Sequence, residues 1–381
     1  MRATLRQFAY LLALPVAFAT AAAQTVTVPL TPDAWEGTDS VRVESYLGRR
    51  SLYINRGVAL ARGVTLENGT IEYDIAASPR TSFLGLSFRA VSPTFSEVLL
   101  ARPRQSGTPQ ALQYAPAFNN VAAAWQVYHG PGSEAVANVE RERWIHVRVE
   151  LDGPTARFFF DSATVPSLSV AHLAGSGGNR FGVWTGAYGR GAYFSNIRYT
   201  PSAGSVTTAG TPRPEPGVIA QWELSNVVEP EAFTPASLPR LEKLSWRHVT
   251  AEPEGFVLVN RWYAQPNGGL PVKPGTNEVL VDSVMTGKIS SSKVVYARTT
   301  IESPRAERRR MQFTYSDGVI VYLNGRPIAF AMNPQGLRDG LGMMAQVGDA
   351  VYLPLEQGRN EIVFAVIELT GGWAFGAKLD R

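Results

Sequence analysis

Residues Gly69-Thr-Ile-Glu-Tyr-Asp-Ile-Ala-Ala77 predict a β-strand with one polar and one apolar face. Side chains along a strand point alternately to its two sides, so Glu72, Asp74 and Ala76 share one face, while the intervening isoleucines and tyrosine share the other. The apolar face suits a β-sandwich core, and the two carboxylates look outward together. This strand therefore indicates both the fold class and the place where polar side chains gather.

The same alternation recurs along the chain. Helical periodicity is nearly absent, and short alternating segments bounded by Gly, Pro, Asn and Asp are typical of β-sandwiches. The clearest segment is Trp144-Ile-His-Val-Arg-Val-Glu-Leu151, which Asp152-Gly153 turns into Arg157-Phe-Phe-Phe160. We therefore predict an all-β protein in which this hairpin has one wet face.

A break in composition divides the chain. Residues 201–217 combine small polar residues with Thr211-Pro-Arg-Pro-Glu-Pro-Gly217, which is typical of an extended linker. The second half again predicts strands, and Asn324-Gly325 within residues 317–328 predicts a tight hairpin turn. Pro327 would protect the edge of the returning strand. We therefore predict β-sandwich (jelly-roll) domains at 24–200 and 218–381, joined by a Pro-rich linker.

The first 23 residues have the pattern of a secretory signal, with Arg2 and Arg6 before an apolar run and Ala21-Ala22-Ala23 at its end. We expect cleavage after Ala23 and no transmembrane segment in the mature chain. The sequence contains no cysteine, which excludes disulfides, thiolate metal sites and cysteine nucleophiles. Export without disulfides favours a secreted or periplasmic bacterial protein.

The charge of the chain does not favour nucleic acid as a partner. The formal net charge is +4, and Arg2 and Arg6 supply two of these charges. A basic cluster at Arg305 and residues 308–310 has no interleaved aromatic residues, so we interpret it as a solvated loop.

Residues 64–200 resemble the concanavalin A-like lectin/glucanase superfamily, particularly its laminin-G-like and glycoside-hydrolase-16-like members. The resemblance implies a two-sheet jelly roll whose concave sheet forms a ligand groove. It rests on the order of five short segments, at residues 67–74, 83–90, 144–149, 181–184 and 192–198.

Residues 278–381 resemble the galactose-binding-domain-like jelly roll found beside many bacterial glycosidases, and residues 218–277 fit as its opening strands. Family members often hold a structural calcium through loop carbonyls and an Asp. No acidic loop of recognisable spacing occurs here, so we assign no metal ligands and predict no cofactor, apart from the calcium that the resemblance allows. The segments that carry the resemblance are residues 297–301, 316–326, 351–355, 358–362 and 372–375.

The first resemblance also raises the question of catalysis. Glycoside-hydrolase-16 enzymes carry a Glu-x-Asp-x-Glu strand, sometimes with one bulged residue, whose last Glu is the acid/base. Glu72 and Asp74 match the first two positions, but Ala76 and Ala77 occupy both forms of the third. Without the last Glu, a proton-transfer contribution of roughly 10²- to 10⁴-fold is lost. We therefore assign no catalytic residue.

Sugar recognition needs flat apolar faces together with planar hydrogen-bonding groups. Trp125-Gln-Val-Tyr-His129 offers both and is interpreted as a strand, although its Trp and Tyr would then point to opposite faces. Each candidate also has a structural interpretation: a solvated strand face for the carboxylates and core packing for the tryptophans. The predicted ligand-binding residues are Glu72, Asp74, Arg89, Trp125, Tyr128 and Trp373.

The preferred interpretation is an exported, non-catalytic carbohydrate-binding protein whose two modules bind one polysaccharide with avidity. One alternative is a glycoside-hydrolase-16-like enzyme with a degenerate or rearranged carboxylate pair, which would need a carboxylate facing Glu72, such as Glu97, Glu134 or Glu150. Another alternative is a structural or adhesive cell-surface protein that binds another protein through an apolar patch.

Overall fold

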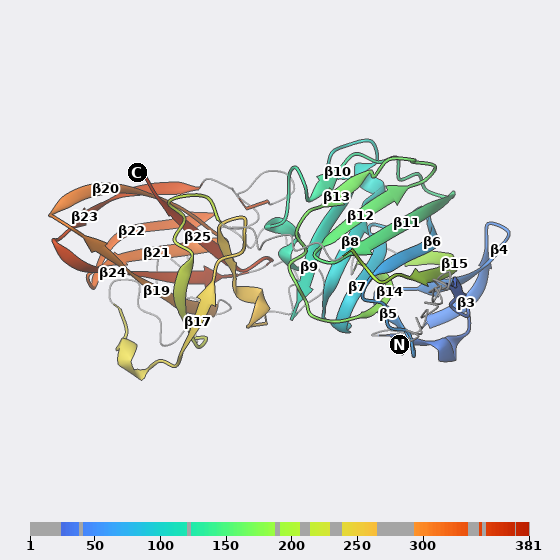
Figure 1. Ribbon diagram of the computed structural model, residues 1–381, viewed down its shortest axis with the longest axis horizontal. Helices are drawn as coiled ribbons and strands as arrows, with labels where there is room; N and C mark the ends of the chain where they lie inside the picture. Colours follow the sequence, from blue (N-terminus) through green and yellow to red (C-terminus); the bar gives the residue numbers. More distant parts are fainter. Residues whose placement is uncertain are drawn as a thin grey trace, which may run out of the picture.

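The computed structural model describes residues 24–37, 41–119, 123–186, 191–205, 214–228, 238–264, 293–333, 343–344, 348–369 and 371–380. The predicted leader, residues 1–23, and residues 206–213 of the predicted linker lie outside these ranges. Two β-sandwiches lie end to end along the long axis, as Figure 1 shows. The described residues confirm the all-β fold class, since their helical elements are short 3-10 turns: η1 (Pro32–Ala34), η2 (Pro103–Gln105), η3 (Ala123–Gln126), η5 (Leu241–Lys243) and η6 (Val259–Arg261).

The first half of the chain folds into two antiparallel sheets. In sheet 1 the described strands follow the order β13-β12-β11-β6-β15-β4-β3, with β1 paired to β15, and in sheet 2 the order β10-β9-β8-β7-β14-β5-β2. The strands of sheet 1 are β1 (Val26–Thr27), β3 (Val41–Tyr46), β4 (Arg49–Ile54), β6 (Gly69–Ala77), β11 (Trp144–Asp152), β12 (Thr155–Phe160), β13 (Leu168–Val170) and β15 (Ala192–Pro201). Those of sheet 2 are β2 (Trp35–Gly37), β5 (Gly57–Ala61), β7 (Leu84–Ser92), β8 (Phe95–Ala101), β9 (Leu112–Phe118), β10 (Glu134–Ala135) and β14 (Arg180–Thr185).

Strand β6 lies in the middle of sheet 1, between β11 and β15. Its Ile71, Tyr73 and Ile75 are buried in the core between the two sheets, as the alternation predicts. The β11–β12 hairpin is also confirmed, and along β11 the buried residues alternate with half-buried ones. The outer face of sheet 1 is therefore polar, whereas sheet 2 carries a second buried apolar cluster on its outer face, around Leu60, Leu100 and other residues.

The second half of the chain also folds into two antiparallel sheets, which enclose a core that includes Trp222, Phe364 and Trp373. The described strands follow the order β17-β16-β19-β24-β21-β22 in sheet 3 and β18-β25-β20-β23 in sheet 4. Sheet 3 contains β16 (Gln221–Ser225), β17 (Trp246–Thr250), β19 (Lys293–Ser303), β21 (Asp317–Leu323), β22 (Arg326–Asn333) and β24 (Gly358–Glu368). Sheet 4 contains β18 (Phe256–Leu258), β20 (Glu307–Tyr315), β23 (Asp349–Leu355) and β25 (Ala374–Leu379).

Local sequence signals in this half are partly confirmed. Asn324 and Gly325 have φ angles of +48° and +80°, as their tight turn requires, and Pro327 lies on the edge strand β22. The interpretation of the basic cluster as a loop is wrong, because residues 308–310 lie within β20 and pair with β23. The guanidinium of Arg310 forms an ion pair of 3.0 Å with Asp380, so a neighbouring carboxylate supports its place on the sheet.

The two sandwiches share buried contacts at a junction. The core between sheets 1 and 2 continues into Phe256 and Met344 of the second half. The backbone N–H of Met344 donates to the carbonyl of Gln126 at 2.8 Å, and the ring Nε2 of His129 lies 2.7 Å from the carbonyl of Met344. The Gln126 side chain in turn accepts a hydrogen bond of 2.6 Å from the N–H of Gly372. These contacts fix the two halves against each other.

Candidate functional site

Three pairs of side chains flank β6 on the outer face of sheet 1, and the strand register places them. Glu72 lies opposite Arg148 of β11 and Arg198 of β15, and Asp74 lies opposite His146 of β11. Successive outward residues on a strand are about 6.6 Å apart. Ala76 lies opposite Trp144 and Tyr193. Each of these three residues forms one rung with its cross-strand neighbours: the charged rung at Glu72, the mixed rung at Asp74 and the aromatic rung at Ala76. Together the three rungs form the outer-face site.

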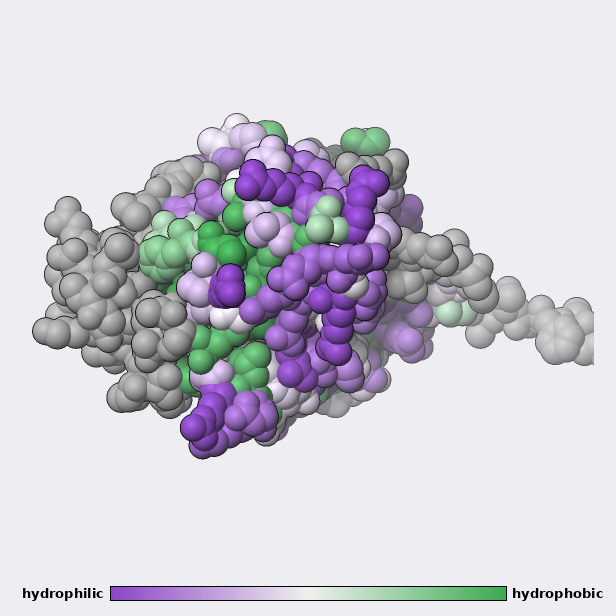
Figure 2. Space-filling model, turned by 90° about the vertical axis from the view of Figure 1, so that its left-hand side faces the viewer, coloured by the Kyte–Doolittle hydropathy of each residue, from purple (hydrophilic) through white to green (hydrophobic). Residues whose placement is uncertain are grey.

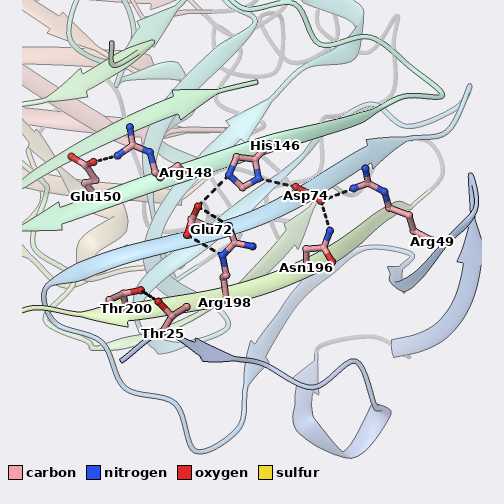
Figure 3. Close-up of polar contacts among 10 residues, drawn as sticks. All are labelled: Thr25, Arg49, Glu72, Asp74, His146, Arg148, Glu150, Asn196, Arg198 and Thr200. Atoms are coloured by element: carbon pink, nitrogen blue, oxygen red, sulfur yellow. Dashed lines mark hydrogen bonds and ion pairs between the residues drawn. The ribbon is translucent and has the colours of Figure 1, made fainter. Parts of the chain in front are cut away.

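The charged rung is held by a bidentate ion pair. Nε and Nη2 of Arg198 each donate to a different carboxylate oxygen of Glu72 at 2.9 Å (Figure 3). These hydrogen bonds lower the pKa of Glu72, although its partial burial opposes them. On the other side of Glu72, Arg148 forms an ion pair with Glu150 and lies over the ring of Phe159. Glu72 is therefore an ionised, immobilised acceptor at neutral pH.

The mixed rung depends on a bulge in β15. The β15–β6 register shifts between Ser195 and Arg198, and Asn196 has a φ of +51°, which Asn tolerates better than most residues. The bulge turns the Asn196 amide outward, where its Nδ2 donates to Asp74 at 2.6 Å. Both oxygens of Asp74 are engaged, because Arg49 also donates at 2.5 Å and the His146 Nδ1 lies at 2.8 Å. His146 Nε2 lies 3.4 Å from Glu72 and so links this rung to the charged one.

The aromatic rung explains the alanine in the strand. Ala76 is fully buried although it points outward, because it lies between Trp144 and Tyr193. The Tyr193 ring stacks on Tyr46 with 3.7 Å between centroids, and Tyr46 meets Trp144 edge to face at 6.3 Å. Loss of water around Tyr193 and the nearby carboxylate of Glu44 raise the pKa of the Tyr193 phenol to about 12. A long side chain at position 76 would displace these rings.

The outer-face site contains two carboxylates of the glycosidase strand pattern but not the third. The lowered pKa keeps Glu72 ionised, which suits the nucleophile of a glycosidase pair but not its proton donor, and Ala76 leaves the usual position of that donor without a carboxyl group. Asp74 is fixed by three donors, and the third carboxylate of the catalytic strand pattern is replaced by aromatic rings over Ala76. The arrangement is suited to accepting and donating hydrogen bonds beside an apolar surface.

Of the other carboxylates considered for catalysis, two lie in sheet 2 and one shares the outer face of sheet 1 with Glu72. Glu97 is buried inside the first sandwich, where it accepts hydrogen bonds from the Tyr114 hydroxyl at 2.6 Å and the Ser176 N–H at 2.7 Å. Glu134 lies in sheet 2 and accepts a hydrogen bond from the N–H of Gly130. Glu150 shares the outer face of sheet 1, but Arg148 and Arg157 pair with it.

The structure brings together two of the six predicted ligand-binding residues, Glu72 and Asp74. Arg89 instead lies at the end of the sandwich, where its guanidinium donates to the Gly153 and Glu67 carbonyls. Trp373 is fully buried in the second core, as its structural interpretation predicts.

The alternation of Trp125 to His129 suggested a strand, but the structure shows none here. Instead, the segment begins in the 3-10 turn η3 at the junction. Trp125 packs partly buried against the first core, and Tyr128 is buried, with its ring 5.4 Å from that of Phe256. Tertiary packing of the two halves overrides the local pattern here, and neither side chain lies in the outer-face site.

Most residues of the outer-face site were missed from the sequence. His146 was seen only as a polar residue on a strand, and Arg198 only as part of a family segment. Trp144 opened a predicted strand, but nothing local shows that it lies beside Ala76. The missing information is the pairing of β6 with β15, which lie more than a hundred residues apart in sequence.

No group of three or more His, Cys, Asp or Glu residues in the described ranges is arranged to hold a metal ion. The structural calcium therefore stays a prediction that has no assigned ligands. None of the helices in the described part of the chain has the length and apolar character needed to cross a membrane.

Neither a protein-family model nor a curated protein matches the sequence. Among solved structures, the carbohydrate-binding module CBM66 from Bacillus subtilis is 13% identical with a TM-score of 0.32, and the match covers 48% of this chain and 99% of that one. The exoplasmic/lumenal domain of VIP36, in a form bound to Ca²⁺ and Man3GlcNAc, is 11% identical with a TM-score of 0.34 (49% and 90% covered). A glycosidic hydrolase is 14% identical with a TM-score of 0.31 (50% and 100% covered). Similarities this distant do not identify a ligand, so the function is argued from the side chains.

Proposed function

We propose that this chain is an exported, non-catalytic carbohydrate-binding protein and that the outer-face site binds a polysaccharide. The aromatic rung carries the proposal, because it places apolar ring surface where a hydrolase of the Glu-x-Asp-x-Glu type would have its acid. Next to it, the mixed and charged rungs offer guanidinium, imidazole and amide groups that suit sugar hydroxyls. The first half would then be concanavalin A-like, and the second half would be galactose-binding-like.

The site suits a polymer more than a small ligand. It lies on an open sheet face, and the distance along β6 from the charged to the aromatic rung is about 13 Å. At the far end of β15, a hydrogen bond of 2.7 Å between the Thr25 and Thr200 hydroxyls continues the polar surface (Figure 3). The charges of Glu72 and Asp74 are balanced by arginines, so an uncharged glycan would meet no unpaired carboxylate here.

Binding to insoluble polysaccharides by the full chain tests the proposal. We expect retention on at least one polysaccharide, and we expect Trp144→Ala to weaken it about tenfold, since an aromatic contact contributes roughly 1.4 kcal/mol. Tyr352→Ala is the matched control, because this tyrosine is 65% exposed on β23, away from the site. No retention on any polysaccharide, or equal losses from both substitutions, would contradict the proposal.

The hydrolase alternative makes the opposite prediction for the same material. If Glu72 is only a binding group, incubation with the retained polysaccharide releases no reducing sugar, and Glu72→Gln changes only the affinity. If the wild type releases reducing sugar and Glu72→Gln abolishes this release, the chain is a hydrolase that uses Glu72.

An adhesive role is favoured by one feature of the second sandwich. The free end of this half shows apolar side chains near the centre of the view, with polar residues to their right and below them (Figure 2). Among the described residues of this half, the large apolar side chains of Phe330 and Tyr352 are 42% and 65% exposed. Loss of cell or protein attachment on Phe330→Ser, with polysaccharide binding unchanged, would support this second function.

A further inference from the structure

A cavity of about 470 Å³ lies at the junction and is lined by both halves of the chain. The first half contributes Tyr128, His129 and His172, and the second contributes Glu254 and Gln312, among others. Pockets for small ligands have volumes of about 300 to 1,000 Å³ and lie preferentially between domains. The cavity is therefore large enough for a small molecule, and it is separate from the outer-face site.

Tyr128 gives this cavity a polar group that lacks a partner. The residue is 4% exposed, and its hydroxyl has no hydrogen-bond partner among the described residues. The ring itself is fixed by edge-to-face contacts with Tyr114 at 5.7 Å and Phe256 at 5.4 Å. The hydroxyl itself is buried behind the wall of the cavity, so a ligand would have to displace part of that wall to reach it, and a ligand oxygen that did so would be stabilised because a buried unsatisfied hydroxyl is costly.

The walls combine hydrogen-bonding and apolar groups. Glu254 lines the cavity, and none of the described residues forms an ion pair with it. Loss of water around its carboxyl group raises the pKa, while a backbone hydrogen bond and His172 oppose this effect. At the mouth, Lys378 forms an ion pair of 2.7 Å with Glu215. The apolar part of the wall includes Phe256.

We propose that this junction cavity is a second saccharide site, which binds one or two sugar rings through Tyr128, His172 and Glu254. A sugar ring presents C–H surface to apolar walls and hydroxyls to a phenol, an imidazole and a carboxyl group, so it matches both parts of the lining. The limited volume admits a monosaccharide, a disaccharide or a chain end, whereas the open outer-face site accepts the middle of a polymer. The proposal shares the ligand class of the proposed function but uses different residues.

Isothermal titration of the full chain with glucose, galactose, cellobiose and maltose tests this site. We expect at least one of these sugars to bind, and Tyr128→Phe to weaken that binding about fivefold through loss of one hydrogen bond. Tyr128→Phe removes only an unpartnered hydroxyl, so the unliganded protein should be as stable as the wild type or more stable. Glu254→Gln, which keeps the shape of the side chain, should weaken binding to a similar extent.

Trp144→Ala separates the two sites. The junction site requires that this substitution leaves the small-sugar affinity unchanged, and that Tyr128→Phe leaves retention on polysaccharide unchanged. If none of the four sugars binds, if Tyr128→Phe has no effect on their affinity, or if Trp144→Ala abolishes it, the junction site is refuted. Retention on polysaccharide, measured separately, decides whether the outer-face site stands.

Discussion

Replacement of Arg261 by methionine is expected to remove about 3 kcal/mol from the free energy of unfolding, because it breaks the ion pair at the junction. Nη2 and Nε of Arg261 donate to the Glu252 carboxylate at 2.6 and 3.1 Å. Nη2 also donates to the carbonyl of Ala174 in the first half at 2.8 Å, and the guanidinium carbon lies 4.4 Å from the ring centroid of Phe118. The side chain therefore joins the two sandwiches.

The magnitude follows from burial. The side chains of Arg261 and Glu252 are only 20% and 11% exposed. Removal of one partner of a buried pair costs about 3 to 5 kcal/mol, because a charge is left without compensation, and the residual exposure of Arg261 places the value at the lower end. In a Glu252→Gln background no charge is left behind, so the same substitution should cost only about 1.5 kcal/mol.

Denaturant unfolding of the four proteins of this cycle measures the coupling. Arg143→Met is the control, because the Arg143 and Asp161 side chains are 36% and 42% exposed, and an exposed pair contributes about 0 to 1 kcal/mol. The reasoning is refuted if Arg261→Met costs no more than Arg143→Met, or if the effects of the two substitutions at the junction simply add.

Three further outcomes are expected. Arg198 lowers the pKa of Glu72, so the ionised carboxylate stabilises the fold fully above its usual pKa of 4.5, and this stabilisation is lost as the pH falls below that value. The Glu72→Gln variant should therefore lose less stability than the wild type between about pH 7 and pH 3, as measured by the midpoint of unfolding. Gly69→Ala should destabilise the fold by more than about 2 kcal/mol in denaturant, because Gly69 has a φ of +139° and a Cβ there would lie 2.3 Å from the Thr200 carbonyl oxygen; a smaller cost would show that the two strands separate easily. Trp373→Ala should cost about 4 kcal/mol by the same assay, since the ring is fully buried, and a stable variant that merely loses ligand binding would contradict this core role.

Local patterns predicted those features of the fold that depend on neighbouring residues. The alternation along β6 gave the correct outward face for Glu72 and Asp74, because a strand with one buried side admits only one orientation. Asn324-Gly325 predicted its turn for a similar reason, since few residue pairs accept two positive φ angles.

Features that depend on distant pairing could not be predicted in this way. The outer-face site needs Arg198 and Asn196 beside β6, and their placement depends on a strand register and a bulge that join distant parts of the chain. Residues 125–129 alternate like a strand, yet the 3-10 turn η3 ends at Gln126 and the residues after it pack at the junction. The basic residues 308–310, interpreted from the sequence as a solvated loop, lie in a strand because long arginine side chains can cross its surface and bring their charged ends to water or Asp380.

The shared core at the junction limits how this protein can be taken apart. Phe256 and Met344 pack into the core of the first half, so expression of either half alone would uncover apolar surface that the other half now covers. A protease cut between residues 205 and 214 should therefore leave two fragments that stay associated. Neither half is a portable binding tag that could be fused to another protein without its neighbour.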